Sequence, residues 1–215
     1  MGARYVVFHV SDVSLEETLS YRFTHTDHQV VGAALELLNK ALGTQEWGFE
    51  FLAENLWWPG LTLTRADIAR EVIEGIPAKR KGFMLDTGHM AHTCLDLETE
   101  EETVEYILRQ VDALGEAGGY IRGMHLQCGL TGGFVKEMLK KRPRAEGSTY
   151  FERLGNAYEY VLGIDPHEPF TSPAAGRLVE RVRPEYLTHE LITWDLEEYT
   201  RKLRRQRAAI GRGKA

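Results

Sequence analysis

A short apolar run that ends in an acid, a glycine and a histidine lies near the middle of the chain: Phe83-Met84-Leu85-Asp86-Thr87-Gly88-His89. The run predicts a β-strand, in which alternate side chains point to opposite faces, so that Met84 and Asp86 share a face. Asp86 would then end the strand, and His89 would lie on the loop beyond it. Catalytic groups occupy that position in a βα barrel. Taken alone, the same pattern also fits a carboxylate that caps the next turn and a histidine on the surface.

Four further predicted strands end in the same way. The five strands span Tyr5–Val10, Phe49–Glu54, Phe83–Asp86, Tyr120–Leu126 and Tyr186–Leu191. A histidine or an acid lies at or next to the carboxyl end of each: His9, Glu54, Asp86, His125 and Glu190. Helical patterns separate the strands, and this alternation predicts an α/β fold with a parallel sheet and right-handed crossovers.

Capping residues mark where the predicted helices begin. We expect helices over residues 28–42, after Thr64, after Thr99, over 134–141, over 150–162, after Ser172 and over 196–209. Asp27 is predicted to cap the first helix, and Thr64 the second, with Asp67 at capping-box spacing. The polar residues between the first strand and His28 are expected to form a loop. The pattern therefore predicts one domain over residues 1–215, with a long excursion at about 127–172.

Composition narrows the classes of partner and compartment. The net charge of the chain is −6. The segment from Arg201 onward holds basic residues and no acids, so the residues before it carry a net charge more negative than −6. An acidic body argues against a nucleic-acid partner. No apolar run approaches the ~20 residues that span a bilayer. The cysteines Cys94 and Cys128 are too few for a disulfide framework, which favours a reduced, cytoplasmic setting.

The polar strand ends predict a metal site. Because the strands are parallel, their carboxyl ends converge on one side of the sheet. Glu54, Asp86, His125 and Glu190 would then form an oxygen-rich set with one nitrogen ligand, which suits Mn²⁺, Mg²⁺, Co²⁺ or Zn²⁺. The alternative is a set of independent polar strand ends that cap helices or form salt bridges.

Several of these segments resemble the xylose-isomerase-like TIM-barrel superfamily, which includes sugar and sugar-phosphate isomerases and epimerases and endonuclease IV. The matching segments are Glu54-Asn55-Leu56, Leu85 to Met90, Met124-His125-Leu126 and Glu190. The resemblance implies one divalent metal held by Glu54, Asp86, His125 and Glu190. It also implies that His89 contacts the substrate, and His9 is predicted to bind the substrate from the same rim.

The resemblance further implies a metal-dependent isomerase or epimerase that acts on a sugar or sugar phosphate. Glu54 and Glu190 would be the catalytic pair of an enediolate-type proton transfer. Trp57 and Trp58 could stack on the substrate or simply cover the barrel mouth.

The chain also departs from this superfamily. A TIM barrel has eight βα units, and the first three have no counterpart among the five recognised here. The chain is therefore a short form, or two chains complete each other. An open sheet exposes its edges, so we expect a homodimer or higher oligomer that associates through a sheet edge or the excursion. The substrate-binding arginine expected after His125 is absent from residues 127–132.

A second set of residues points to another activity. Asp165 and His167 match a second metal site in endonuclease IV, and His9 matches a further ligand there. The alternatives to an isomerase are thus a metal-dependent phosphodiesterase and an inactive truncated barrel. Of the remaining residues, His189 is expected to face the helices, and Cys128 is not expected to be a nucleophile. His25, His28 and His92 are expected on the surface.

Overall fold

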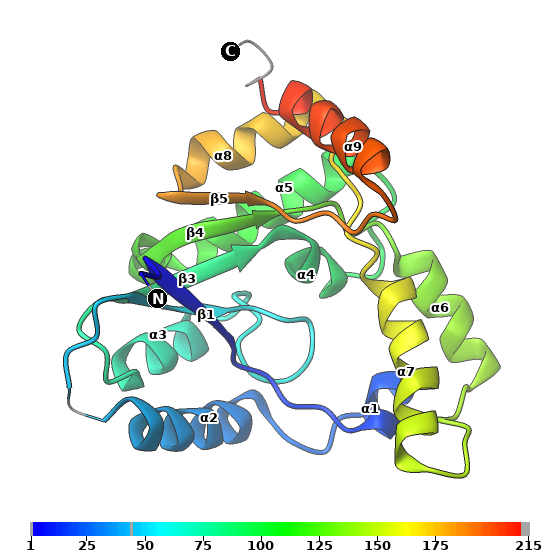
Figure 1. The fold of residues 1–215 in the computed structure, drawn as a ribbon, viewed down its shortest axis with the longest axis horizontal. Coiled ribbons are helices and arrows are strands. Elements are labelled where there is room, and N and C mark those ends of the chain that lie inside the picture. Colours follow the sequence, from blue (N-terminus) through cyan, green and yellow to red (C-terminus); the bar gives the residue numbers. More distant parts are fainter. Residues whose placement is uncertain (1, 44, 212–215) are drawn as a thin grey trace.

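The apolar runs form a single sheet of parallel strands in the computed structural model, which describes residues 2–43 and 45–211. The strands are β1 (Tyr5–His9), β2 (Glu50–Glu54), β3 (Lys81–Asp86), β4 (Ile121–Leu126) and β5 (Tyr186–His189). They lie side by side in chain order, and each neighbouring pair is parallel. Their carboxyl ends point toward the side that carries α4, α6 and α7 (Figure 1). The predicted α/β class and parallel sheet are confirmed.

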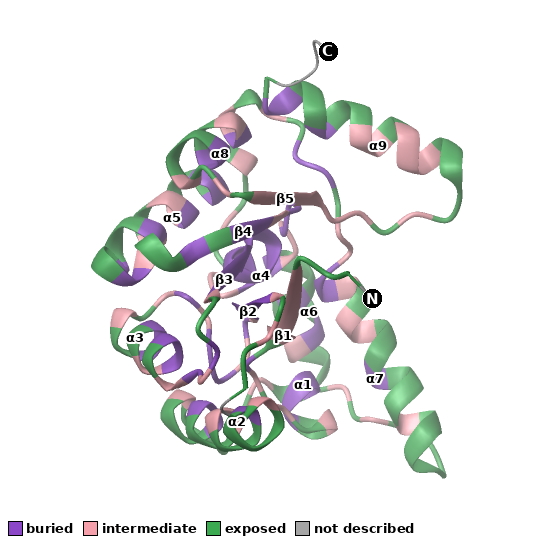
Figure 2. Cartoon of the chain, turned by 60° about the vertical axis from the view of Figure 1, so that its left-hand side comes forward, coloured by how far each residue is buried: buried purple, intermediate pink, exposed green. Residues whose placement is uncertain are grey.

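Helices alternate with these strands, as the sequence predicts. The α-helices are α1 (Leu15–Ser20), α2 (Asp27–Leu42), α3 (Ala66–Gly75), α4 (Thr87–His92), α5 (Glu100–Ala113), α6 (Gly132–Lys141), α7 (Tyr150–Ile164), α8 (Gly176–Val182) and α9 (Leu196–Ala209). Short 3-10 helices span Gly115–Tyr120 and Pro173–Ala175. The buried residues gather in the middle strands β2, β3 and β4 and on the inward sides of the helices, whereas the edge strands β1 and β5 are of intermediate burial (Figure 2). The excursion contributes α6 and α7, which lie beyond the carboxyl ends of the strands.

The outer face of the sheet packs on the helices. Phe51, Phe83 and Leu85 from the strands share one core with residues of α2, α3, α5 and α8. The inner face is filled by its own side chains. Leu52 and Met84 are fully buried there, and a side chain at Gly123 would collide with the Met84 sulfur, so the glycine makes room for this packing.

The sheet curls until its two edge strands meet at their amino ends. The rings of Tyr5 in β1 and Tyr186 in β5 lie 4.5 Å apart between centroids. The Tyr186 hydroxyl also donates a hydrogen bond to the buried Glu50 carboxylate at 3.2 Å, across the curl. Arg122 donates to the same carboxylate. The result is a half-barrel of five strands rather than a complete TIM barrel.

Two helix starts differ from the sequence prediction. Thr26, not Asp27, caps α2, in a capping box with Gln29. The Asp27 carboxylate instead accepts a hydrogen bond from the Gly60 backbone N–H at 3.1 Å. Arg65 precedes α3 and makes no side-chain cap, so the predicted capping by Thr64 is wrong. Both errors have one cause, because a capping residue is chosen by local geometry among adjacent polar residues.

Two short helices replace segments predicted as loops. The helix α1 lies within the polar stretch before His28 and begins with a capping box of Ser14 and Glu17. The helix α4 starts directly after β3 and contains His89. A helix of about one and a half turns has too few residues to show an apolar period, so the sequence pattern could not reveal either one.

Candidate metal centre

The centre is built around Asp86, which is fully buried at the end of β3. One of its carboxylate oxygens accepts the His89 backbone N–H at 2.7 Å and so caps α4. The Asn55 side chain fixes the strand end, accepting from the Asp86 N–H at 2.8 Å and donating to its C=O at 3.0 Å. Asp86 therefore caps the next helix and also points into the centre, so the two interpretations of this residue are compatible.

The four ligands predicted from the strand ends lie together. The potential ligand atoms of Glu54, Asp86, His125 and Glu190 all lie within 4.8 Å of one another. His125 Nδ1 lies between the two glutamates, 2.9 Å from Glu54 Oε1 and 2.8 Å from Glu190 Oε2. The carboxyl ends of neighbouring parallel strands thus bring these residues together, although they are spread over 136 positions of sequence.

Two further groupings overlap with the first. His89, Asp165 and His167 form one, in which His89 Nε2 lies 3.1 Å from Asp165 Oδ2. His9, Glu54 and His89 form the other, with His9 Nε2 3.1 Å from Glu54 Oε2. Glu54 and His89 are shared between groupings. The arrangement is therefore one continuous centre with room for more than one ligand set, and every ligand candidate named from the sequence belongs to it.

Three residues of the centre were not anticipated from the sequence: Asn55, His92 and Gln127. The prediction that His92 lies on the surface is wrong, since it is buried with its Nε2 3.2 Å from Asp165 Oδ1. Gln127 Nε2 donates to Asp165 Oδ1 at 2.9 Å and lies 3.2 and 3.3 Å from the two Asp86 oxygens. The spacing held a signal for His92, because residues three apart share a helix face and His92 follows His89 by three.

Charge in the centre is unbalanced without a cation. It holds the four carboxylates of Glu54, Asp86, Asp165 and Glu190. Among the described residues, every salt-bridge partner of these acids is a histidine, and none is a lysine or arginine. Buried carboxylates are costly unless they are paired or bind a metal. In the part of the chain that the structure describes, protonated histidines are the cations that can pair with these carboxylates, and neutral donors such as Gln127 add hydrogen bonds.

The pKa values of the carboxylates and histidines in the centre reflect this excess of buried negative charge. Burial raises the pKa of Asp86 to about 7. Burial disfavours the charged form of His125, but hydrogen bonds and charge interactions with Glu190 and Glu54 outweigh it and raise its pKa to about 10. The pKa of Asp165 is below its usual range, because contacts with His89 and His92 outweigh its burial. His89 and His125, whose pKa values are both raised to about 10, therefore carry protons that a bound cation would replace.

The donor set fits a divalent metal. The single N–H at His125 Nδ1 cannot donate well to both Glu54 and Glu190. Glu190 Oε2 is therefore buried without a hydrogen bond of good geometry, although it lies close to His125. An oxygen-rich set with histidine nitrogens and one unsatisfied carboxylate oxygen suits Mn²⁺, Co²⁺, Mg²⁺ or Zn²⁺. The Asn55 and Gln127 contacts would orient the ligands from outside the first coordination sphere.

The two tryptophans cover one side of the centre. The Trp57 ring is buried, with its centroid 5.2 Å from that of His89 and 5.0 Å from that of His92. Trp58 is half-buried and lies 4.5 Å from Trp57 between ring centroids. This packing matches the covering role that the sequence left open. Contact of either ring with a substrate stays a prediction.

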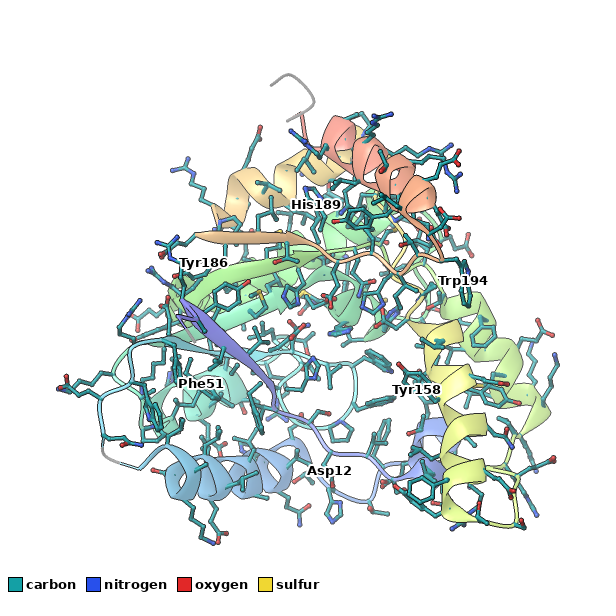
Figure 3. The ribbon with its side chains drawn as sticks, viewed as in Figure 1. Asp12, Phe51, Tyr158, Tyr186, His189 and Trp194 are labelled. Carbon is teal, nitrogen blue, oxygen red and sulfur yellow. The ribbon has the colours of Figure 1, made fainter. Side chains whose placement is uncertain are left out.

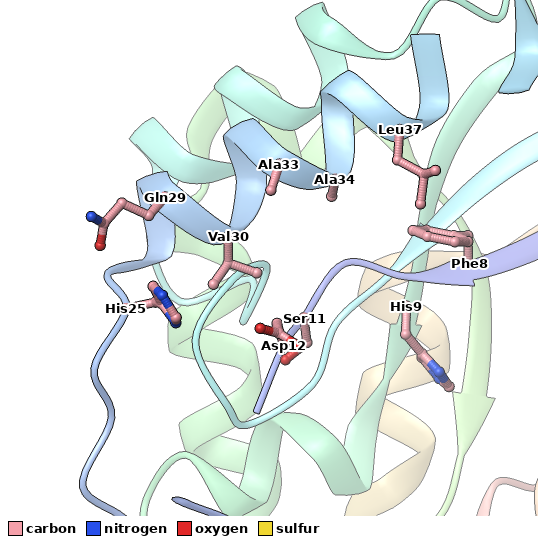
Figure 4. Close-up of a pocket in the computed structure, with 10 residues that line it drawn as sticks. All are labelled: Phe8, His9, Ser11, Asp12, His25, Gln29, Val30, Ala33, Ala34 and Leu37. Atoms are coloured by element: carbon pink, nitrogen blue, oxygen red, sulfur yellow. The ribbon is translucent and has the colours of Figure 1, made fainter. Parts of the chain in front are cut away.

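His9 marks the open side of the centre. Its side chain is 54% exposed, whereas that of Glu54 beside it is 3% exposed. Phe8 and His9 lie on opposite sides of β1 (Figure 4). A hollow of about 280 Å³ lies between β1 and α2, lined by apolar residues such as Phe8, Val30 and Leu37 and by polar residues such as Asp12 and Gln29. The hollow reaches His9 but no other ligand candidate, so it is not the metal centre.

The remaining predictions concern residues outside the ligand set. His189 contacts Gln206 of α9, its Nδ1 lying 2.9 Å from the amide nitrogen, and so faces the helices as predicted (Figure 3). Burial raises the pKa of Cys128 to about 12, which leaves the thiol protonated and unsuited to nucleophilic attack. His25 and His28 are both exposed, as predicted, and His28 lies beside Glu71.

Comparison with known proteins adds no relative. No family model matches the sequence, and a search of the curated proteins finds no significant match. None of the helices within residues 2–43 and 45–211 combines the length and the apolar character needed to cross a membrane. Function must therefore be argued from the chemistry of the centre.

Proposed function

We propose that this protein is a divalent-metal-dependent enzyme whose cation is held by Glu54, Asp86, His125 and Glu190. The observation that carries the proposal is the convergence of these four ligands within 4.8 Å, in a centre with no fixed cation among the described residues. A structural cluster of salt bridges would be expected to include lysine or arginine. Buried carboxylates whose salt-bridge partners are all histidines are typical of a metal site.

The reaction we propose is isomerisation or epimerisation of a sugar or sugar phosphate, as the resemblance to the xylose-isomerase-like superfamily implies. A bound divalent metal would polarise adjacent oxygens of a hydroxycarbonyl substrate and make the carbon-bound proton between them more acidic. Glu54 and Glu190 approach His125 Nδ1 together and are the candidate bases. Contacts with His125 and His9 outweigh burial and lower the pKa of Glu54, which keeps it ionised and able to accept a proton.

A second candidate is a metal-dependent phosphodiesterase. It is supported by the additional grouping of His89, Asp165 and His167, which offers a second ligand set next to the first. Two adjacent metals can stabilise both the attacking and the leaving oxygen of a phosphoryl displacement. A single-metal proton transfer does not need this second set.

Elemental analysis of the purified protein tests the metal proposal. We expect near-stoichiometric Mn, Co or Zn in the wild-type protein and a large loss in the Glu190→Gln variant. Glu185→Gln is the matched control, because Glu185 is exposed and paired with Arg122. If the wild-type protein and the Glu185→Gln control both lack metal after incubation with Mn²⁺, Co²⁺ and Zn²⁺, the metal proposal is wrong.

Two activity assays separate the candidate reactions. Turnover of ketoses, lost in Glu54→Gln, supports the isomerase. Cleavage of DNA that contains an abasic site, lost in His167→Asn, supports the phosphodiesterase. Metal binding without either activity would support the third alternative, a barrel that is no longer catalytic.

A further inference from the structure

A second hollow lies away from the metal centre, between α1 and the connection from α6 to α7. Its volume is about 740 Å³. We call it the arginine hollow, because Arg22, Arg142 and Arg144 line it, with an apolar floor that includes Leu19, Leu139 and Pro143. The two walls are neighbours in space, since α1 packs beside α7 and near the end of α6 (Figure 1). The hollow shares no residue with the metal centre.

Local structure brings the arginines together. Tyr21 ends α1 in the left-handed conformation, with φ of 52°, and Arg22 follows it. The Glu17 carboxylate then accepts hydrogen bonds from the Thr24 N–H at 2.6 Å and hydroxyl at 2.7 Å, which holds this turn against α1. Arg142 ends α6 in the same unusual conformation, with φ of 49°. Both turns are thus defined by the backbone, and they direct the chain to opposite walls of one hollow.

The three guanidinium groups have no partner among the described residues. Within the described residues, no hydrogen bond or salt bridge is made by the guanidinium of Arg22, Arg142 or Arg144, and Arg22 donates only its backbone N–H, to the Ser20 hydroxyl at 3.3 Å. Other arginines do find carboxylates, as Arg177 does with Glu105. The acid that lines the hollow is Glu16, which lies 3.9 Å from Arg153 outside it. In a chain of net charge −6, this is a local concentration of unpaired positive charge.

We propose that the arginine hollow binds a small organic phosphate. A guanidinium group recognises phosphate through paired N–H donors, and three of them around a concave surface focus the positive potential. The apolar floor would take the organic part of the ligand, and the volume lies within the range of small-molecule sites, about 300–1,000 Å³. A nucleic acid fits less well, because the chain as a whole carries a net charge of −6, whereas binding a nucleic acid depends on many cationic contacts to phosphates.

Calorimetric titration with phenyl phosphate at low ionic strength tests this proposal. We expect saturable binding to the wild-type protein and at least tenfold weaker binding to the double variant Arg142→Gln/Arg144→Gln. The matched control is Arg204→Gln/Arg205→Gln, which removes two exposed arginines of α9, and its affinity should stay within twofold of wild type. Benzyl alcohol, which lacks the phosphate, should not bind measurably.

Three outcomes would overturn the proposal. They are the absence of phenyl phosphate binding to the wild-type protein, equal weakening in the two double variants, and binding of inorganic phosphate as tight as that of phenyl phosphate. The last would show that the apolar floor takes no part. The single variant Arg22→Gln removes an arginine from the opposite wall and should also weaken the binding of phenyl phosphate. This second variant distinguishes loss of the binding site from a local loss of structure in the double variant. These results do not depend on whether the metal centre is catalytic.

Discussion

Gln127 connects two parts of the metal centre through a single amide nitrogen. That nitrogen donates to Asp165 and approaches both oxygens of Asp86, so one neutral group holds two carboxylates close together. The side chain is fully buried, and its Oε1 has no hydrogen-bond partner. It lies two residues after His125, the interval at which strand residues share a face. Gln127 is therefore a positioning residue for ligands on both sides.

The Gln127→Leu variant should bind metal more weakly. Loss of an outer contact that orients a ligand typically costs about 10- to 100-fold in metal affinity. Titration calorimetry with Mn²⁺ measures this change. Thr103→Val serves as the control, because it removes a buried hydroxyl from α5, away from the centre. Equal affinity in wild type and Gln127→Leu would show that the amide does not orient the ligands.

The raised pKa of His125 predicts that metal affinity depends on pH. With a pKa of about 10, the metal-free protein carries a proton on His125 at neutral pH. Metal requires the neutral imidazole, so binding releases this proton and becomes tighter as the pH rises toward 10. Calorimetry at pH 6, 7 and 8 should show this increase, and buffers of different ionisation enthalpy should show proton release. An affinity that is flat over this range would contradict the prediction.

The same pKa shift has a consequence for the stability of the metal-free protein. The folded-state value lies above the ordinary value of 6.5, so the protonated form stabilises the fold. This contribution is complete below about pH 6.5 and is lost as the pH rises toward 10. Denaturant unfolding of wild type and His125→Gln should therefore differ most near pH 6 and converge above pH 10. A difference that grows with pH would exclude this account.

At the scale of elements, the buried polar side chain of Gln206 helps to attach α9 to the half-barrel. Gln206 accepts from the Phe170 N–H at 2.7 Å and donates to the Leu126 carbonyl at 2.8 Å. Its amide nitrogen also lies 2.9 Å from His189 Nδ1. The helix is thereby joined to the end of β4, to β5 and to the end of the excursion. The packing of α9 therefore depends on a polar contact as well as on its apolar stripe.

Gln206→Leu should destabilise the protein by about 2 kcal/mol, because it leaves a buried N–H and a buried carbonyl without partners. The midpoint of urea unfolding reports this loss, with Arg205→Gln as a control on the exposed side of the same helix. Metal affinity should change little, since Gln206 contacts no ligand. An unchanged midpoint would mean that water replaces these hydrogen bonds.

At the scale of the whole molecule, the half-barrel has two open edges. Among the described residues, β1 and β5 each pair with a strand on one side, and the rings of Tyr5 and Tyr186 are in contact between them. Exposed aromatic residues follow β5 in the chain and lie in the excursion. Trp194, which comes after β5, is 94% exposed (Figure 3). Phe151 of α7, in the excursion, is 80% exposed. Unpaired edges and exposed apolar groups favour association.

We therefore expect a dimer or a higher oligomer in solution. Light scattering coupled to gel filtration measures the mass directly. Phe151→Ser should reduce association if the excursion forms the interface, and Trp194→Ser should do so if the edge next to β5 forms it. A monodisperse monomer across the accessible concentrations would rule out association.

The local sequence pattern was sufficient to predict the strands and the residues at their carboxyl ends. Apolar period and chain order fix a parallel sheet, and a parallel sheet places all carboxyl ends on one side. For this reason the sequence itself predicts that Glu54, Asp86, His125 and Glu190 lie together. The same argument placed His189 on the helix side, since neighbouring strand residues face opposite ways.

The tertiary structure alone determined which residues complete the centre and how the sheet closes. His92 approaches Asp165 across 73 positions because the excursion folds back over α4, and no local period encodes that return. The meeting of Tyr5 and Tyr186 likewise depends on the accumulated curl of all five strands. The arginine hollow is likewise a feature that only the tertiary structure determined, since its walls come from α1 and the end of α6. Local sequence specifies elements and faces, whereas contacts between distant segments arise from packing the whole chain.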